Sequence, residues 1–566
     1  MSETTVLPRG RMLMIAAIQG LALFVLYASL DAKVWPTDQP FWSFPLWTVA
    51  VFAPLVMLLS LTPNNTRQVF RLTGVLTALL VMAAMYVGWQ VQPYEETGTS
   101  SIAVIFVVSS ALAVFKALMH LQQRANQVPL TYDLLFTYSW RNFLVAALSG
   151  AFVGGVAVIL ALWGGLFSII GIDFFADLFT EPWFFLPVAS IAFGLGVTIF
   201  RNLTHIIDSI NRLLEALIRL LLPLVVVVAL IFIGTLPIVG LGPLWDTGTG
   251  TALLLWLTTG VLFFVNAVYQ SGRETIPYPL AVHRLVYVGV CVLPIVSALS
   301  FYGLWLRVEQ YGWTVERCWA MVVWLVLALF SFGYTFGVVR RGVEWPETLG
   351  RVNTYMGLGI LALMLLVNLP VLDFRKIALS SQEARVESGV ISWQEFDFFY
   401  ATNNLGRPGY LLKQRLLEEI GDTDPELKDL IENPRHISTI WMQSERDQIW
   451  QSMSFRPPGI VLPDGLQLRV TESVNPSDGG EYVMIEIDLT GDDVDDYVVL
   501  VVQQGYVGYG YLFYVDGPGN WQMRNMYRRN QQQQTTDGNV VQEGAITTSA
   551  PRFSGLKIEE LLFEVQ

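Results

Sequence analysis

Apolar residues fill most of the chain up to residue 372, in runs of about 20 positions separated by short polar segments. A run of that length crosses the hydrocarbon core of a bilayer as an α-helix, which needs about 20 residues. The pattern predicts eleven spans, at about residues 12–30, 42–62, 70–90, 101–120, 143–170, 183–201, 216–238, 251–270, 284–305, 318–339 and 354–372. We expect the long run 143–170 to tilt or break, and 171–187 to be re-entrant or interfacial.

Basic residues are concentrated in alternate loops between these runs, starting with the segment before the first one. Short loops that are rich in Lys and Arg stay on the cytoplasmic side of a membrane. One loop departs from the pattern, because Arg307 and Arg317 fall on the predicted outer side, offset by Glu309 and Glu316. The alternation predicts a cytoplasmic N-terminus and, after an odd number of crossings, a C-terminus on the outer side, which in a bacterium is the periplasm.

The segment THIIDSINRLLEALIR, residues 204–219, has a helical period. Its apolar residues share one face, and the opposite face pairs Asp208 with Arg212 and Glu215 with Arg219 at i,i+4 spacing. The segment predicts either an amphipathic helix at the cytoplasmic interface or a span that extends into the cytoplasm.

After residue 372 the pattern changes. Residues 373–455 read as a helical juxtamembrane segment, with Ser-x-x-Glu capping boxes at Ser380 and Ser392. From 456 to 566 a period of two predominates, in short segments such as LQLRVT and EYVMIEID, which predicts strands. The fold class is therefore a polytopic α-helical membrane protein with about eleven transmembrane helices, residues 1–372, and a C-terminal soluble α+β domain.

Composition and charge support this division. The chain is 53% hydrophobic and 14% charged, whereas soluble proteins are about 25% charged. The net charge is −13, and the region from residue 373 onward has 16 basic and 30 acidic residues. Such an acidic region argues against nucleic acid and against docking on anionic lipid. Cys291 and Cys318 lie in apolar runs, so we expect two buried thiols, and the first span shows no cleavage-site pattern, so we expect it to be retained.

Familiar catalytic motifs are missing from the sequence. The four histidines, His120, His205, His283 and His436, lack the spacing to another His, Cys or carboxylate that zinc sites need. There is no H-E-x-x-H, G-x-S-x-G, P-loop or Rossmann fingerprint. These patterns argue against a zinc hydrolase, a serine hydrolase and an ATPase of familiar type.

An acidic loop, DLTGDDVDD, places five carboxylates within nine residues from position 488. Ca²⁺ takes six to eight oxygen ligands, which a short loop supplies from alternate positions. The predicted ligands are Asp488, Thr490, Asp492, the carbonyl of Val494, and Asp496. The loop resembles the D-x-[DN]-G-D-G-x-x-D loop of FG-GAP and related domains, but Thr replaces Asn or Asp and an Asp replaces the second Gly. A Ca²⁺ site and a solvated hairpin turn both remain open.

Charged residues are rare within the predicted spans. Lys116 lies close to a helix end and can snorkel, and Asn266 and Asn368 are polar but uncharged. A water-filled cavity at mid-membrane lined by either asparagine would favour a transporter. A groove at the outer face with converging carboxylates would favour a lipid-modifying enzyme, although Asp31 and Asp38 lie in an outer loop that is short for such an active site.

Four separated stretches carry a family resemblance, at residues 132–175, 244–272, 306–320 and 374–409. They begin YDLLFTYSWRNF, LWDTGTGTALLL, LRVEQYGWTVER and FRKIALSSQEAR, and they resemble the multipass bacterial inner-membrane proteins grouped as domain of unknown function 4153. The resemblance extends over about residues 40 to 410. It implies a location in the bacterial envelope, and it brings no established activity or catalytic residues.

The predicted outer loops within these stretches contain a cluster of aromatic and charged residues: Trp245, Asp246, Arg307, Glu309, Tyr311, Trp313 and Arg317. The cluster is interpreted either as a docking surface for the tail or a pocket mouth, or as an ordinary aromatic belt with surface ion pairs.

Together these features predict an integral inner-membrane protein that acts as an envelope binding, scaffold or sensor component. Its C-terminal domain is predicted to be periplasmic, with the acidic loop as a candidate Ca²⁺ site. The expected partners are the lipid bilayer and either an envelope protein or a small-molecule ligand, with no nucleic acid. The alternative is a membrane transporter or a lipid-modifying membrane enzyme.

Overall fold

The computed structural model describes most of the chain up to residue 433 and separate parts of the remainder. The described residues are 9–93, 97, 100–242, 244, 249–269, 277–421, 423–433, 450, 453–458, 460, 462–463, 465–474, 481–490, 494–503, 506–515, 521–528, 546–549, 555–558 and 561–565. The chain divides into two compact units, Met1–Lys428 and Asp429–Gln566.

The first unit contains long apolar helices that match the predicted spans. Within the described residues, eleven are long and apolar enough to cross a membrane. They are α1 (Arg9–Asp31), α2 (Pro40–Ser60), α3 (Thr66–Gln90), α4 (Ser100–Ala125), α5 (Tyr132–Ile169), α7 (Pro182–Asn202), α8 (Thr204–Val239), α10 (Gly250–Tyr269), α11 (Leu280–Tyr311), α12 (Val315–Arg341) and α13 (Pro346–Leu366). The predicted fold class is confirmed for this unit, which is an integral membrane protein by the length and composition of its helices.

Two sequence predictions about individual helices are settled by α5 and α8. The run 143–170 is not broken, because α5 is one helix of 38 residues. Its neighbour α6 (Phe174–Thr180) is a short helix within the segment predicted to be re-entrant or interfacial. The amphipathic segment 204–219 is the first part of α8, so it extends a span, as one of the two interpretations proposed.

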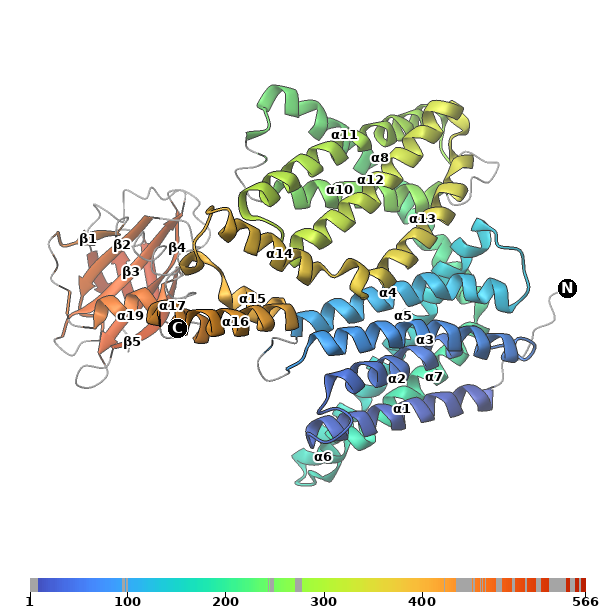
Figure 1. Cartoon of the computed structure of the whole chain (residues 1–566), viewed down its shortest axis with the longest axis horizontal. Coiled ribbons are helices and arrows are strands. Elements are labelled where there is room, and N and C mark those ends of the chain that lie inside the picture. The colour runs from blue at the N-terminus through green and yellow to red at the C-terminus, as the bar shows by residue number, and fades with distance from the viewer. Residues whose placement is uncertain are drawn as a thin grey trace. The chain divides into compact units, whose positions relative to one another are not determined.

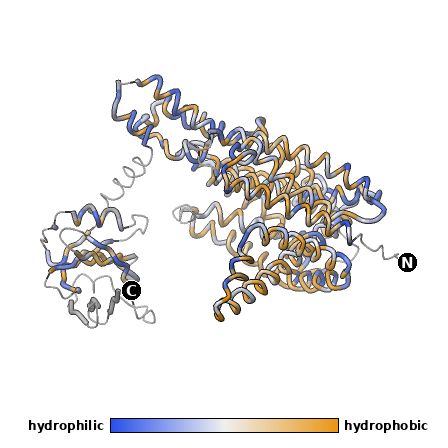
Figure 2. Tube along the Cα trace, turned by 90° about the horizontal axis from the view of Figure 1, so that it is seen from below, coloured by the Kyte–Doolittle hydropathy of each residue, from blue (hydrophilic) through white to orange (hydrophobic). Residues whose placement is uncertain are grey.

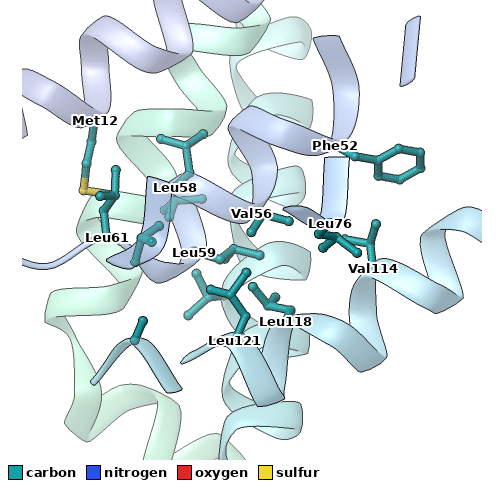
Figure 3. Close-up of a cluster of buried hydrophobic side chains, with 14 of the residues drawn as sticks. Met12, Phe52, Val56, Leu58, Leu59, Leu61, Leu76, Val114, Leu118 and Leu121 are labelled. Atoms are coloured by element: carbon teal, nitrogen blue, oxygen red, sulfur yellow. The ribbon is translucent and has the colours of Figure 1, made fainter. Parts of the chain in front are cut away.

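The spanning helices form two groups (Figure 1), and each group encloses an apolar core. Helices α1–α5 and α7, with the start of α8, enclose a core that includes Leu58, Leu76 and Leu118 (Figure 3). Helices α8 and α10–α13 enclose a second core that includes Val226 and Val290. We call these groups the first bundle and the second bundle.

Many large apolar side chains are exposed on both bundles, whose helices are hydrophobic over most of their length (Figure 2). Ile169 on α5 and Ile238 on α8 are more than four-fifths exposed, at 82% and 85%. A water-soluble protein seldom exposes large contiguous apolar surfaces of this kind. The surface is therefore suited to contact with lipid acyl chains.

The juxtamembrane region continues from the last span into short helices. They are η2 (Pro370–Leu372), α14 (Phe374–Glu387), η3 (Trp393–Glu395), α15 (Phe398–Asn404), α16 (Arg407–Ile420) and α17 (Pro425–Glu432). The capping box at Ser392 and Glu395 is confirmed. The box predicted at Ser380 is wrong, because α14 begins six residues earlier, where the carboxylate of Asp373 accepts the N–H of Arg375 and caps the helix.

The second unit is built on a β-sheet. Its described strands are β1 (Met453–Arg456), β2 (Glu481–Ile487), β3 (Asp496–Gln503), β4 (Tyr506–Val515), β5 (Trp521–Arg528), β6 (Ile546–Ser549), β7 (Gly555–Ile558) and β8 (Leu561–Val565). They form one sheet in the order β1-β2-β3-β4-β5-β8-β7-β6. The pairs are antiparallel except β1 with β2. The predicted α+β domain is confirmed.

Both faces of the central strands are buried. Along β2, Val483 and Ile485 belong to one apolar core, whereas Tyr482 and Met484 belong to another on the opposite face. The second core is covered in part by α19 (Leu466–Ser473), which sequence reasoning took for a strand. That prediction is wrong, because residues 466–473 form a helix that packs on the sheet, with Leu466 and Val470 pointing from one helical face into the core.

Candidate functional site

A cavity of about 440 Å³ lies where the two bundles meet. It is lined by α4 and α5 of the first bundle and by α10, α12 and α13 of the second. Lys116 and His120 are one helical turn apart on α4, so both side chains reach the same cavity wall. The lining residues lie towards the end of the bundles at which α4 leads into α5, and the loop pattern predicts this end to be cytoplasmic.

A network of polar side chains from four helices borders the cavity, and three of its members, Tyr132, Asn266 and Asn353, line one wall. On α10 the amide nitrogen of Asn266 donates to the Leu262 carbonyl, and its oxygen accepts from the Tyr334 hydroxyl of α12 at 2.6 Å. Asn353 of α13 donates to that same oxygen and to the Tyr132 hydroxyl of α5, the latter at 2.6 Å. Because a buried polar group is stable only when it is bonded, this network fixes the relative positions of α5, α10, α12 and α13.

The remaining wall is largely aromatic. The aromatic lining residues are Phe115, Phe136, Trp140, Phe143, Phe263 and Phe330. Phe143 and Phe263 are about half exposed on the outside of the bundles. The cavity therefore reaches the lipid-facing surface between α5 and α10. An apolar chain that enters from the bilayer would meet rings along its path and polar groups at its end.

Lys116 brings an amine to the cavity wall. No Asp or Glu lines the cavity, and none of the ion pairs in the described part of the chain involves Lys116. The sequence placed Lys116 near a helix end, whereas α4 continues for more than two turns beyond it, to Ala125. Since a buried ammonium is stable only when it is paired, a charged Lys116 would favour a site that an anion can enter.

Asn368, the other intramembrane amide singled out from the sequence, has a different role. It is buried, and its amide nitrogen donates to the Ser109 hydroxyl of α4 at 2.8 Å and to the Met364 carbonyl at 2.9 Å. It borders only a small cavity of about 40 Å³. The contact joins α4 to the end of α13, so Asn368 serves helix packing.

Part of the predicted outer cluster meets the juxtamembrane helix α14. The amide nitrogen of Gln382 on α14 donates to the carbonyls of Tyr311 and Trp313, both at 3.0 Å. The Trp313 N–H donates to the Ser381 hydroxyl at 2.9 Å. The guanidinium of Arg317 donates to the carbonyl of Gly312.

Three members of that cluster also contact one another. The Arg307 and Arg317 guanidinium groups lie 6.0 and 5.4 Å from the Tyr311 ring centroid, within range of a cation–π contact. Glu309 is exposed. Trp245 and Asp246 lie outside the described residues. The cluster thus contacts α14 within the first unit, and docking of the C-terminal domain on it stays a prediction.

Two contacts that the sequence did not predict also hold the juxtamembrane helices. The Tyr400 hydroxyl of α15 accepts the Val315 N–H at 2.8 Å and donates to the Glu316 carboxylate at 3.1 Å. Burial, together with the nearby Glu316 charge, raises the pKa of Tyr400. The hydroxyl therefore stays protonated and keeps donating. Asp373, at the end of η2, accepts from Tyr86 and Gln90 of α3.

The acidic loop of the second unit is described in part. Asp496 is 2% exposed, and one of its carboxylate oxygens accepts the N–H groups of Leu489 and Thr490, both at 2.8 Å. The Thr490 hydroxyl is buried and has no hydrogen-bond partner in the described part of the chain. Val494 is half exposed, and Asp492 lies outside the described residues. Asp496 thus stabilises the turn, and binding of Ca²⁺ stays a prediction.

The cavity residues were only partly accessible to sequence reasoning. Lys116 and Asn266 were noticed as polar positions in spans, but Tyr132, Tyr334 and Asn353 were not. Asn353 falls one residue before the predicted start of the last span, so it was read as part of a loop. Within the described residues, no group of three or more His, Cys, Asp or Glu side chains is placed to hold a metal ion.

Comparison with known proteins gives a family and nothing further. The sequence model of the family described as "Domain of unknown function (DUF4153)" matches residues 15–412. No curated protein and no solved structure matches the chain. The matched region includes all the helices that line the cavity and most of the juxtamembrane helices. The chain therefore belongs to the DUF4153 family.

Proposed function

We propose that this protein is an envelope component that binds an anionic amphipathic molecule in the cavity between its two helical bundles. The observation that carries the proposal is the Lys116 ammonium, which faces an aromatic-lined cavity with no carboxylate among the residues that line it. A lipid-like ligand matches this wall, because its charged end pairs with Lys116 and its chain packs on the rings.

The size and position of the cavity support binding. Its volume of about 440 Å³ lies within the 300–1,000 Å³ typical of ligand sites, so it accommodates a headgroup and part of a chain. The amides of Asn266 and Asn353 and the Tyr132 hydroxyl provide further hydrogen-bonding groups. Because the lining residues lie towards one end of the bundles, the ligand enters from one leaflet. This position favours a binding or sensor role over a central transport site.

Binding is tested with the full chain in a mild non-ionic detergent. We expect lysophosphatidic acid to bind more tightly than lysophosphatidylcholine, measured by native mass spectrometry across a titration. Lys116→Gln should lower the affinity for lysophosphatidic acid at least about tenfold, because a hydrogen bond between charged groups contributes about 1.5–3 kcal/mol.

Two matched variants complete this test. Lys116→Arg keeps the charge and should retain binding. Lys33→Gln removes the same charge from an exposed loop position and should leave binding unchanged. Equal affinity of Lys116→Gln and the unchanged protein for lysophosphatidic acid would exclude Lys116 as the recognition group.

The location and the role of the C-terminal unit belong to the same proposal. The alternation of basic loops supports a bacterial inner-membrane location with a periplasmic C-terminal domain, where Ca²⁺ is available to the acidic loop. We expect a reporter fused after Gln566 to function only outside the cytoplasm. We also expect millimolar Ca²⁺ to raise the melting temperature of the full chain, and Asp488→Asn to remove that rise. An unchanged melting curve would leave the loop as a solvated turn.

A further inference from the structure

A second cavity, of about 310 Å³, lies at the opposite end of the first unit, between the end of α3 and the juxtamembrane helices α14 and α16. Its polar lining residues are Gln90, Lys376, Glu383, Arg407 and Arg415, and its apolar lining residues are Trp89, Leu379, Pro408, Leu411 and Leu412. Three cations and one carboxylate thus surround this space. None of these residues borders the cavity between the bundles.

The charges of this second cavity are unequally paired. Glu383 forms an ion pair with Arg415. Neither Lys376 nor Arg407 takes part in an ion pair within the described part of the chain. Their cationic groups lie instead over aromatic rings of α3, Arg407 at 4.7 Å from the Trp89 ring centroid and Lys376 at 6.0 Å from that of Tyr86. Two positive charges are therefore left for a ligand.

Two buried polar atoms on this cavity's lining residues also lack partners among the described residues: the Nε of Arg407 and the side-chain oxygen of Gln90. Buried polar atoms in proteins are rarely left without a hydrogen bond. Arg407 Nε–H is a donor, which an oxyanion satisfies. The Gln90 oxygen is an acceptor, which only a donor such as a hydroxyl satisfies. A ligand that forms hydrogen bonds with both atoms carries a negatively charged oxygen and a free hydroxyl group.

The backbone places Arg407 where it can contact an anionic ligand. Arg407 is the first residue of α16, a helix of 14 residues whose N-terminal end carries partial positive charge. The preceding Gly406 has a φ of +59°, and a Cβ atom there would lie 2.6 Å from the Gln90 carbonyl oxygen. Only glycine therefore allows the start of α16 to approach the end of α3 this closely.

The surroundings identify the ligand as a lipid. Gln90 is the last residue of a membrane-spanning helix, so the cavity lies at the level where lipid headgroups begin. Trp89 and Leu411 at its edge are 39% and 51% exposed, and Trp is typical of the membrane–water interface. A headgroup in the cavity would leave its acyl chains beside the apolar surface of the spans.

We propose that this cavity binds the phosphodiester headgroup of an anionic phospholipid that bears a free hydroxyl, of the phosphatidylglycerol type. Lys376 and Arg407 contact the phosphate oxygens, and the side-chain oxygen of Gln90 accepts from a glycerol hydroxyl. The residues that line this site are distinct from those that line the cavity between the bundles, so the two sites bind separate ligand molecules.

The test uses the full chain with Lys116→Gln, so that the cavity between the bundles does not contribute to anion binding. In dodecyl maltoside this protein is titrated with dioctanoylphosphatidylglycerol, and bound lipid is counted by native mass spectrometry. We expect dioctanoylphosphatidic acid, which lacks the glycerol hydroxyls, to bind several-fold more weakly. Dioctanoylphosphatidylcholine, which has no net charge, should bind at least tenfold more weakly.

Variants identify the recognition groups. Lys376→Gln changes an exposed side chain, and Arg407→Gln changes a half-buried one. Each substitution should lower the affinity for phosphatidylglycerol about tenfold. Lys413→Gln removes the same charge from α16 outside the cavity and should have no effect. An unchanged melting temperature for Lys376→Gln shows that the loss is not caused by unfolding. The proposal is overturned if Lys376→Gln binds phosphatidylglycerol as tightly as Lys413→Gln. The lipid assignment is overturned if glycerol 1-phosphate or inorganic phosphate binds as tightly as the lipid.

Discussion

Replacing Asp373 with alanine should destabilise the first unit by about 3–5 kcal/mol, the effect of removing one partner from a buried ion pair. The Asp373 carboxylate is 3% exposed and pairs with Arg375 Nε at 3.0 Å. Its other oxygen accepts from the Tyr86 hydroxyl and the Gln90 amide, both at 2.6 Å. The alanine variant leaves the Arg375 guanidinium buried without a counter-ion and deprives two further donors of their acceptor.

The measurement is the unfolding midpoint of the full chain in mixed micelles with an increasing fraction of sodium dodecyl sulfate. Asp397→Ala removes another carboxylate that caps a juxtamembrane helix, but an exposed one, and should lower stability by about 1 kcal/mol. The double variant Asp373→Ala/Arg375→Met should be more stable than Asp373→Ala, because it also removes the unpaired cation. A loss no larger than that of Asp397→Ala would contradict a stabilising role for this ion pair.

Replacing Gly409 with alanine should separate α16 from α15 and reduce stability by about 3 kcal/mol, the upper part of the range for overpacking. A Cβ atom at position 409 would lie 1.9 Å from the carbonyl oxygen of Ala401. That oxygen belongs to the backbone of α15, so no side-chain rotation relieves the clash. One of the two helices must move.

The control is Gly359→Ala on α13, where an added Cβ meets no atom within 4 Å. There the substitution should be neutral or stabilise the helix by up to about 1 kcal/mol, since alanine favours helices more than glycine does. Thermal melting of both variants in the same detergent provides the comparison. If the two variants melt at the same temperature, the close approach of α15 and α16 does not contribute to stability.

The spans could be predicted because hydrocarbon thickness imposes a minimum length on an apolar run. Their ends could not, since helices continue past the apolar run into polar surroundings. Thus α5 begins at Tyr132, eleven residues before the predicted start, and α8 includes the polar segment 204–219. In the second unit, Leu466 and Val470 fit a strand and a helix equally well. Packing on the sheet stabilises this segment as a helix, and the sequence does not show that packing.

The two cavities could be predicted only in part, because each depends on residues that are far apart in the sequence. Tyr132 and Asn353 are 221 residues apart and share a hydrogen bond. The net charge of the whole C-terminal region also does not show where its basic residues come together. Averaged from residue 373 onward, that region is acidic and argues against anionic lipid. Lys376, Arg407 and Arg415 are nevertheless brought together at one cavity.

Helix α13 connects the two cavities across the membrane. Near its start it carries Asn353, a member of the polar network beside the first cavity, and after its end η2 leads to Asp373, which is bonded to α3 beside the second. The helical part between them, from residue 353 to 366, measures about 20 Å at about 1.5 Å per residue. We expect this uninterrupted stretch of helix to move as one rigid body. We therefore expect ligand binding in the cavity at one leaflet to change the positions of α14 and α16 at the other.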